Sequence, residues 1–560
     1  MRGLRWVRPV QVVFALALVV YLAVGAVLAL RYHFLMGDAL SRVQSAQGAL
    51  FSRDPHLAEI GFIFTPLTSL VEMPLVAFSP WIPEMTRYGL AGVIMSAAFM
   101  AAAVAQIWGI AADRGTPRWQ QVTVTLLFAL NPMILFYGAT GMSEAPFVFL
   151  MCWATRRLIR WTSTDDVHDL ISVGVALGLG YLTRYDAAVA IASAAVFVAV
   201  VTRLRATHAE PSSARSHSRR SALLDAVIVV APGALAVSVW AATSWLLTGQ
   251  LFAQFESGYG NAQILAQSGG PSDAGLSALG FSAASILVLA PALPLLVPAV
   301  AVLAARRRDL EVLVPTLLFG SVLAFQTYSY VTGVTFPFLR FYICVIPLMA
   351  VYALQFSPAR GTLPSRRPGA YASPRDVRQP RIPVAALVAV LALAVSIPIT
   401  LAGMSSRHLS VQQYALGALF GGGEDDPAEQ AKQRAIVDTF ATERQIADHL
   451  DKMNLPEGSV LMDTVYGFAI VAASKNPKQF VVPSDRDFVG ALNDPAGHGV
   501  EYILAIPTEG RGASDVVNRR YPTIFDNGGN VASLVLEIPN TGADQPTWRM
   551  YRVLDEPADE

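Results

Sequence analysis

Three acidic residues and one histidine follow the first long apolar segment of the chain. They are Asp38, Asp54, His56 and Glu59. A carboxylate can orient an acceptor hydroxyl and remove its proton, and this activates an otherwise weak nucleophile. Such residues beside a bilayer would suit a reaction on a substrate that is itself in the bilayer. The alternative is a solvated loop whose charges are ordinary surface charges.

The composition indicates a membrane protein. The chain has 560 residues, of which 54% are hydrophobic and only 15% are charged, whereas soluble domains carry about 25% charged residues. The formal net charge is zero, so nothing indicates a nucleic-acid partner. Cys152 and Cys344 both lie in apolar runs and are interpreted as packing residues, with no disulfide or cysteine-rich metal site implied.

Several segments are long and apolar enough to cross a membrane, which takes about 20 apolar residues. The first follows Arg2, Arg5 and Arg8, and we interpret it as an uncleaved anchor because a signal peptide would have a shorter apolar core and a cleavage site. The eleven predicted spans are 10–30, 87–110, 119–138, 144–160, 168–183, 186–203, 222–247, 276–304, 311–331, 341–357 and 384–403.

The arginines of the connections predict the orientation of these spans. Arginine clusters, such as those in 306–308 and 360–381, fall in alternate connections, and the intervening connections carry few arginines. The positive-inside rule therefore predicts a cytoplasmic N-terminus. The expected location is the inner or plasma membrane, which the chain crosses many times.

The run 60–78 is almost long enough to span but is predicted to lie in the outer interface. It contains Pro66, Glu72 and Pro74. If it crossed the membrane, every later arginine-rich connection would move to the outside. The loop that carries Asp38 is therefore expected to be extracytoplasmic and to fold back on the membrane.

The composition changes after residue 403, where the transmembrane domain (1–403) is predicted to end. A linker (404–426) and an extracytoplasmic domain (427–560) follow, and all four lysines of the chain lie beyond Met404. Short apolar runs alternate there with helix-like stretches, which predicts a small α/β domain. This region has no phosphate-binding glycine motif and no metal-ligand spacing.

Four further ionisable residues are expected at the outer membrane surface. Glu144 ends a tight turn, and Arg184 and Asp186 lie between two short spans. Ionisable residues at such depth are costly unless paired, so they are functional candidates, although a local ion pair that only shapes the turn is an alternative. Arg340 begins the tenth span, where it could contact lipid headgroups or bind a substrate phosphate. The loop 248–275 is aromatic and glycine-rich, which suits a binding lid or a plain surface loop.

Taken in order, these motifs resemble the GT-C glycosyltransferases, in particular bacterial relatives of the protein O-mannosyltransferases and of the lipid A aminoarabinose transferases. The resemblance covers roughly residues 5–355. The implied fold class is a polytopic α-helical membrane protein with about 11 transmembrane helices and a small C-terminal α/β extracytoplasmic domain. The matching motifs are Gly37-Asp38, Phe64-Thr-Pro-Leu67, Ala139-Thr-Gly-Met-Ser-Glu144, Leu182-Thr-Arg-Tyr-Asp186, Trp245-Leu-Leu-Thr-Gly249 and Leu339-Arg-Phe-Tyr-Ile-Cys-Val-Ile-Pro347.

Two positions depart from the family pattern. Ala39 stands where many members have a glutamate, and Thr65 stands where many have a basic residue or a second proline. The second catalytic carboxylate is therefore open among Asp54, Glu59 and Glu144.

The resemblance implies transfer of a sugar from a polyprenyl-phosphate donor to an extracytoplasmic glycan, lipid or protein. Asp38 would be the general base, and Arg184 or Arg340 would hold the leaving phosphate. No metal ligands are assigned, and dependence on a divalent cation is left open. The remaining residues assigned to substrate binding are His56, Glu144 and Asp186.

Two other classes of function fit a protein of this composition. A transporter or flippase would place polar residues near the membrane midplane in broken helices, often as repeats, whereas the ionisable residues here gather at the outer ends of the spans. A non-catalytic scaffold that binds cell-wall polymer through its outer domain is the third hypothesis.

Overall fold

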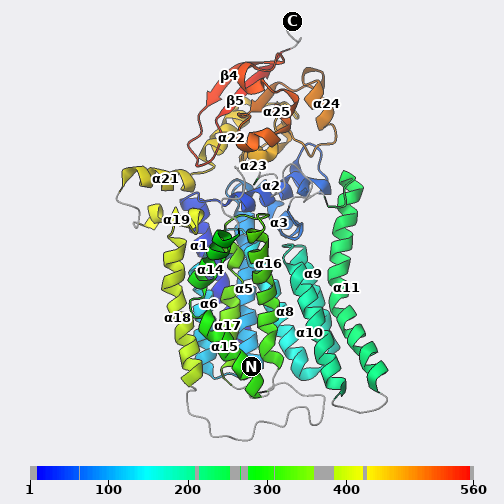
Figure 1. Cartoon of the computed structure of the whole chain (residues 1–560). Helices are drawn as coiled ribbons and strands as arrows, with labels where there is room; N and C mark the ends of the chain where they lie inside the picture. Colours follow the sequence, from blue (N-terminus) through cyan, green and yellow to red (C-terminus); the bar gives the residue numbers. More distant parts are fainter. Residues whose placement is uncertain are drawn as a thin grey trace, which may run out of the picture.

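A computed structural model describes residues 9–61, 64–207, 214–252, 265, 275–307, 310–357, 384–420 and 426–554. Long helices form a bundle, and a small sheet with its own helices lies at one end of that bundle (Figure 1). Most of the loop 248–275, the arginine-rich connection 358–383 and residues 421–425 of the predicted linker lie outside the described residues.

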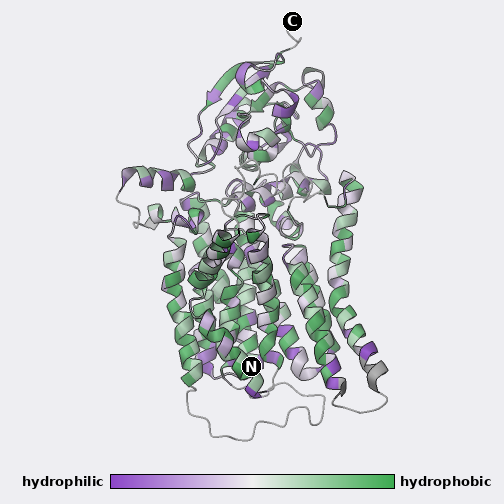
Figure 2. Cartoon of the chain, in the orientation of Figure 1, coloured by the Kyte–Doolittle hydropathy of each residue, from purple (hydrophilic) through white to green (hydrophobic). Residues whose placement is uncertain are grey.

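Within the described ranges, six helices are long and apolar enough to cross a membrane, and Figure 2 shows that the bundle is mainly hydrophobic. Two bent helix pairs raise the number to eight if each pair is one span, with bends of 58° and 76°. The protein is therefore a multi-pass membrane protein. The six helices are α1 with η1 (Pro9–Arg31), α5 (Leu90–Asp113), α10 (Ala187–Thr207), α11 (Ala214–Thr248), η3 with α16 (Leu310–Val331) and α18 (Val384–Met404); the pairs are α6 (Arg118–Ala129) with α7 (Pro132–Ala139), and α14 (Leu276–Leu289) with α15 (Leu293–Arg307).

The eleven predicted segments are all largely helical, but the number of eleven spans is not confirmed. The helix α8 (Glu144–Thr164) carries several charged residues, and α9 (Val167–Tyr181) is only 15 residues long. The predicted span 341–357 corresponds to η4 (Leu339–Tyr342) and α17 (Val345–Gln355), and α17 is also short. These three segments are not among the candidate spans. Length and composition therefore support six to eight spans.

The first loop, defined as residues 32–89, lies between the bundle and the C-terminal sheet (Figure 1). It contains α2 (Gly37–Phe51), η2 (Leu57–Ile60), α3 (Leu67–Val76) and α4 (Glu84–Arg87). The predicted interfacial run thus contains a helix of 10 residues, α3, with Pro74 inside it. A helix of this length is too short to span a bilayer.

The C-terminal unit, defined as residues 427–554, contains a five-stranded sheet in the order β2-β1-β3-β5-β4. The strands β1, β2 and β3 are parallel, and β5 is antiparallel to both of its neighbours. The strands are β1 (Val460–Leu461), β2 (Phe480–Val481), β3 (Tyr502–Ala505), β4 (Ala532–Ile538) and β5 (Trp548–Val553). The helices are α21 (Pro427–Val437), α22 (Ala441–Met453), α23 (Thr464–Ala473), η5 (Pro477–Gln479), α24 (Phe488–Asn493), η6 (Ala496–His498), η7 (Gly510–Ser514), α25 (Val516–Arg520) and α26 (Ile524–Asn527); α19 (Val411–Tyr414) and α20 (Gly417–Phe420) precede them.

The C-terminal unit packs directly on the first loop. Leu40 of α2 shares an apolar cluster with Ala469 and Ala472 of α23. The guanidinium of Arg87 donates to both carboxylate oxygens of Asp448, at 2.8 Å each. Apolar packing and a paired guanidinium together hold the sheet against the loop that carries Asp38.

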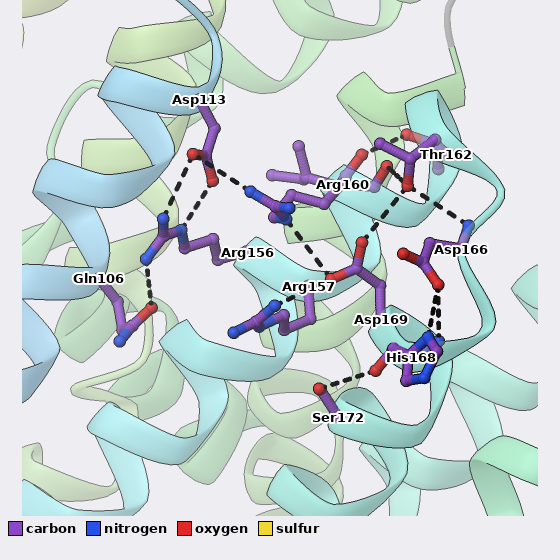
Figure 3. Close-up of polar contacts among 12 residues, drawn as sticks. Gln106, Asp113, Arg156, Arg157, Arg160, Thr162, Asp166, His168, Asp169 and Ser172 are labelled. Atoms are coloured by element: carbon purple, nitrogen blue, oxygen red, sulfur yellow. Dashed lines mark hydrogen bonds and ion pairs between the residues drawn. The ribbon is translucent and has the colours of Figure 1, made fainter. Parts of the chain in front are cut away.

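A network of charged residues joins the C-terminal ends of α5 and α8 to the N-terminal end of α9 (Figure 3). Arg156 donates to the two carboxylate oxygens of Asp113 at 2.7 and 3.2 Å, and Arg160 lies 3.4 Å from the same carboxylate. Arg160 also lies 3.4 Å from Asp169, which accepts a hydrogen bond from Arg157. Two carboxylates thus link three helices, which indicates a structural role for these arginines.

We expect Asp113→Asn to destabilise the protein by about 1.5–3 kcal/mol, because two partly buried guanidinium groups lose their shared charged acceptor. Thermal unfolding of the full-length protein in detergent measures this change. Asp166→Asn is the matched control, because Asp166 contacts the exposed His168 and an asparagine can still cap α9. Equal unfolding temperatures for the two variants would contradict the structural role.

Candidate active site

Asp38 and Arg340 meet at the end of the bundle that faces the C-terminal unit. Asp38 lies in the first turn of α2, and Arg340 lies in η4, a 3-10 turn that precedes α17. The Arg340 Nη2 atom donates to Asp38 Oδ2 at 2.8 Å. The Asp38 side chain is 38% exposed and that of Arg340 is 9% exposed, so the carboxylate is accessible while the guanidinium beside it is buried.

Glu144 connects this pair to the Arg184 turn. The Glu144 Oε1 atom accepts a hydrogen bond from Arg184 Nη1 at 2.9 Å and lies 3.6 Å from Arg340 Nε. Arg184 Nε donates to Asp186 Oδ2 at 2.9 Å. We call these five residues the charged cluster: Asp38, Glu144, Arg184, Asp186 and Arg340. Glu144 is only 1% exposed, so both guanidinium groups compensate a buried charge.

Local backbone structure places Glu144 and Arg184 next to each other. Gly141 has a φ of 75°, and a side chain there would meet the backbone of Gly92. This glycine therefore permits the tight turn that starts α8 with Glu144 in its first turn, where the helix dipole favours a negative charge. The Leu67 amide donates to the Leu182 carbonyl at 2.9 Å, which ties the first loop to the Arg184 turn.

Aromatic rings form the surroundings of the two arginines. The Arg340 guanidinium lies 4.5 Å from the centroid of the Phe338 ring and 5.5 Å from that of Phe341. The Arg184 guanidinium lies 5.1 Å from the Phe341 centroid and 5.7 Å from that of Phe147. Cation–π contacts of this kind orient a guanidinium while it stays charged.

Two residues near the cluster were not predicted from the sequence. Arg42 donates from Nη1 to the Asp38 carbonyl oxygen, and its guanidinium lies 4.4 Å from the centroid of the Phe64 ring. Its position four residues after Asp38 on α2 was the sequence signal that could have identified it. Glu72 is completely buried, and neither of its carboxylate oxygens has a hydrogen-bond partner among the described residues. Burial raises the pKa of Glu72 well above its ordinary value, although Arg42 acts in the opposite direction.

The electrostatic surroundings keep Asp38 ionised. Burial alone would raise the pKa of the Asp38 carboxyl, but the positive charges of Arg340 and Arg42 outweigh it and hold this pKa below its ordinary value. At neutral pH the group is therefore a carboxylate, which is the form that can accept a proton.

Asp54, His56 and Glu59 lie apart from the charged cluster, where the first loop contacts the C-terminal unit. The Asp54 Oδ2 atom accepts a hydrogen bond from the Arg486 amide at 3.3 Å, and the Asp54 carbonyl contacts His56 Nδ1. Glu59 Oε2 accepts a hydrogen bond from Ser484 Oγ at 2.7 Å and packs against Gly48. Gly48 is ten residues beyond Asp38 on α2, so Glu59 and Asp38 are separated by roughly 15 Å of helix. The catalytic or binding roles of these three residues stay predictions.

Because the Glu59 carboxyl is buried, we expect the stability of the protein to depend on pH. Burial raises its pKa from 4.5 to about 7. The folded protein therefore holds a proton that the unfolded chain releases near pH 4.5, so stability should decrease as the pH rises from about 4.5 to 7. Glu59→Gln removes this loss, because a glutamine can still accept from Ser484.

Thermal unfolding of full-length wild type and Glu59→Gln between pH 5 and pH 8 measures the effect. The variant should unfold near the wild-type temperature at pH 5 and at a clearly higher temperature at pH 8. Glu457→Gln is the control, because the Glu457 side chain is 60% exposed. A difference between Glu59→Gln and wild type that does not change with pH would contradict the expectation.

Metal-ligating residues do not gather in the described part of the chain. None of its groups of three or more histidine, cysteine, aspartate or glutamate side chains is arranged to hold a metal ion. Dependence on a divalent cation stays open.

Residues 86–240 match a family model described as dolichyl-phosphate-mannose-protein mannosyltransferase. This segment includes Glu144, Arg184 and Asp186. No curated protein matches the chain in a comparison of sequences. The family match supports the resemblance to GT-C glycosyltransferases that the sequence motifs predict.

Three solved structures with similarity to the chain are compared by identity, TM-score and coverage. The S. cerevisiae protein O-mannosyltransferase Pmt1-Pmt2 complex bound to the sugar donor is 15% identical, with a TM-score of 0.30 over 44% of this chain and 34% of that chain. ArnT from Cupriavidus metallidurans in the apo state is 14% identical, with a TM-score of 0.47 over 98% of this chain and 99% of that chain. The archaeal oligosaccharyltransferase AglB from Archaeoglobus fulgidus, in complex with an inhibitory peptide and a dolichol-phosphate, is 10% identical. Its TM-score is 0.39, and the match covers 88% of this chain and 69% of that chain. The chain thus spans about a third of the length of the first of these structures.

Proposed function

We propose that the protein is an integral-membrane glycosyltransferase that moves a sugar from a polyprenyl-phosphate donor to an extracytoplasmic acceptor. The acceptor is a glycan, a lipid or a protein of the cell envelope. The observation that carries this proposal is the contact between the accessible Asp38 carboxylate and the buried Arg340 guanidinium. A general base and a binding group for a leaving phosphate then lie side by side.

In the proposed reaction, the Asp38 carboxylate orients the acceptor hydroxyl and takes its proton. The acceptor oxygen forms a bond to the anomeric carbon of the sugar while the bond from that carbon to the phosphate oxygen breaks. The electron pair of the broken bond leaves with the polyprenyl phosphate. Because the pKa of Asp38 is low, proton transfer fits best late in the step, when the new bond makes the hydroxyl more acidic. A single displacement inverts the anomeric centre.

Arg340 is suited to couple the base to the leaving group. A guanidinium has five N–H donors, and among the described residues Arg340 donates one hydrogen bond, from Nη2 to Asp38. Its other donors can bind a phosphate oxygen while Nη2 keeps Asp38 in place. Arg184 uses Nε and Nη1 for Asp186 and Glu144, so in this proposal it holds Glu144 and supports the phosphate site.

Mass spectrometry of envelope glycans, lipids and glycoproteins tests the proposal. It compares cells from which the protein has been deleted with the same cells after reintroduction of either wild type or Asp38→Asn. We expect at least one glycosylated species to require the wild-type protein and to be missing with the variant. Identical profiles in all cells would contradict the transferase. A species that requires the protein but not Asp38 would favour a transporter or flippase instead.

The proposed orientation places the N-terminus in the cytoplasm of a cell with this protein in its inner or plasma membrane. Residues 1–403 then form the membrane domain, 404–426 the linker and 427–560 an extracytoplasmic domain. A reporter that is active only outside the cytoplasm should be active when fused after Val553. Activity of a cytoplasmic reporter at the same point would contradict the outer placement of Asp38.

A further inference from the structure

The C-terminal unit turns the carboxyl ends of its parallel strands toward the first loop. Asp463 and α23 follow β1, Asp485 follows β2, and η7 follows β3. Asp485 accepts a hydrogen bond from Arg53 of the first loop at 3.2 Å, and α23 packs on α2. In open sheets with parallel strands, ligands bind beyond the carboxyl ends, where the order of the strands switches direction. Here that point lies between β1 and β3. The strand β2 lies on one side of β1, and the next strand in the sequence, β3, lies on the opposite side.

Arg511 occupies this edge of the sheet. Its guanidinium lies 5.0 Å from the centroid of the Tyr466 ring, and its Nη2 atom donates to the Val465 carbonyl at 3.5 Å. Both contacts are in the first turn of α23, the helix that packs on Leu40 of α2. Asp38 lies two residues before Leu40, and the positive charge of Arg511 acts on its carboxylate. The C-terminal unit thus places a cation at the start of the helix that packs on α2 at Leu40, two residues from the proposed base along the chain.

Hydrogen bonds of two buried side chains, Asn518 and Asp463, fix the turn that carries Arg511. The Asn518 side-chain amide donates to the carbonyl oxygens of Ile506 at 3.1 Å and Gly512 at 3.0 Å. The Asp463 carboxylate accepts from the Val465 amide at 2.7 Å and from the Val516 amide at 2.8 Å. These bonds tie the end of β3 and the start of α25 to α23, so the position of Arg511 relative to Tyr466 is preorganised.

Arg511 differs from Arg340 and Arg184 in its charge balance. Those two arginines face carboxylates at 2.8 and 2.9 Å, whereas Arg511 forms no ion pair with any residue that the structure describes. Its one hydrogen bond to a described residue is long, at 3.5 Å. A partly buried guanidinium that is preorganised but has no charged partner is suited to bind an anionic ligand.

We propose that the acceptor carries an anionic group, a carboxylate or a phosphate, and that Arg511 binds this group between the C-terminal unit and α2. This inference rests on the proposed transferase function. The donor reaches the site from the bilayer, whereas Arg511 belongs to the unit that lies beyond the helical bundle (Figure 1). Arg511 is therefore on the side from which the acceptor arrives, and it would position the acceptor hydroxyl at Asp38.

Binding of small probes to the full-length protein in lipid nanodiscs tests this proposal by saturation-transfer NMR. Methyl glucuronide supplies a carboxylate, glycerol phosphate supplies a phosphate, and methyl glucoside is the neutral reference. We expect at least one anionic probe to bind wild type about tenfold or more tightly than methyl glucoside, as for a charge-assisted hydrogen bond. Arg511→Gln should abolish this preference, and Arg511→Lys should retain part of it.

Arg520→Gln is the matched control, because Arg520 also stacks on a tyrosine, with 4.9 Å to the Tyr521 centroid, in the same unit. This variant should keep the wild-type preference. The proposal is overturned if wild type does not prefer either anionic probe, or if Arg511→Gln keeps the preference. Polyprenyl phosphate is titrated into the same samples: wild type that fails to bind it contradicts the proposed function, whereas loss of the anion preference alone contradicts only the role of Arg511.

Discussion

Asp38→Asn should lower the rate of sugar transfer by about 10²–10⁴-fold, the usual effect of removing a general base. The substitution keeps the size and the hydrogen-bonding capacity of the side chain but removes the oxygen that accepts the proton. Binding of polyprenyl phosphate should persist, because Arg340 keeps its other donors. A transfer assay with purified protein and a binding assay with polyprenyl phosphate measure the two effects separately.

Asp54→Asn and Glu59→Gln are the controls for the choice of base. Both residues contact the C-terminal unit at 484–486, and roughly 15 Å of helix separates Glu59 from Asp38. Both variants should therefore retain most of the transfer rate. A near-normal rate for Asp38→Asn together with a crippled control would show that another carboxylate is the base. Near-normal rates for all three would remove the first loop from the catalytic mechanism.

Arg184→Ala should destabilise the protein by about 3–5 kcal/mol, the cost of leaving a buried charge without its partner. Glu144 is 1% exposed and would lose its 2.9 Å contact, with only Arg340 remaining at 3.6 Å. Thermal unfolding of the full-length protein measures the loss. The local ion pair with Asp186, one of the two roles expected for Arg184, is present at 2.9 Å, but the contact with Glu144 extends the role of Arg184 beyond its own turn.

A second substitution separates lost charge compensation from lost packing. Glu144→Gln removes the buried charge, so the double variant Arg184→Ala/Glu144→Gln should recover a large part of the stability. Equal stability of the single and double variants would indicate that packing against Phe147 and Phe341 accounts for the loss. A wild-type unfolding temperature for Arg184→Ala would contradict a structural role of the pair.

Binding of polyprenyl phosphate to those variants that remain folded then assigns the phosphate site. If polyprenyl phosphate binds folded Arg184→Ala with wild-type affinity, Arg340 carries the phosphate in the proposed reaction. Arg340 is the better candidate because it contacts Asp38 directly. A selective loss of phosphate binding in Arg184→Ala would instead place the phosphate at the Arg184 turn.

The sequence alone determined those features that depend on local composition. Apolar length and periodicity identified each segment as helical, because burial of an extended apolar surface needs no knowledge of its partners. It could not determine how many of these helices cross a membrane. Bends of 58° and 76° in two helix pairs, and the charges in α8, make that number depend on packing between helices.

The sequence also identified the charged residues as candidates, but it did not show which of them lie together in space. Asp54, His56 and Glu59 are closest to Asp38 along the chain, yet they contact the C-terminal unit. Arg340 is 302 residues from Asp38 and donates to it. The reason is that a helix carries neighbouring residues apart at 1.5 Å per residue, whereas helix packing brings distant turns together.

The tertiary structure alone decided which charges are compensated. Composition shows a formal net charge of zero but not that Glu144 faces two guanidinium groups while Arg511 has no ion-pair partner among the described residues. These differences arise because pairing requires contact within a few ångströms and exclusion of water, and both are properties of the packed chain. The residue types were visible in the sequence, but the roles proposed for them, as base, phosphate ligand and acceptor ligand, depend on which ends of helices and strands lie near Asp38.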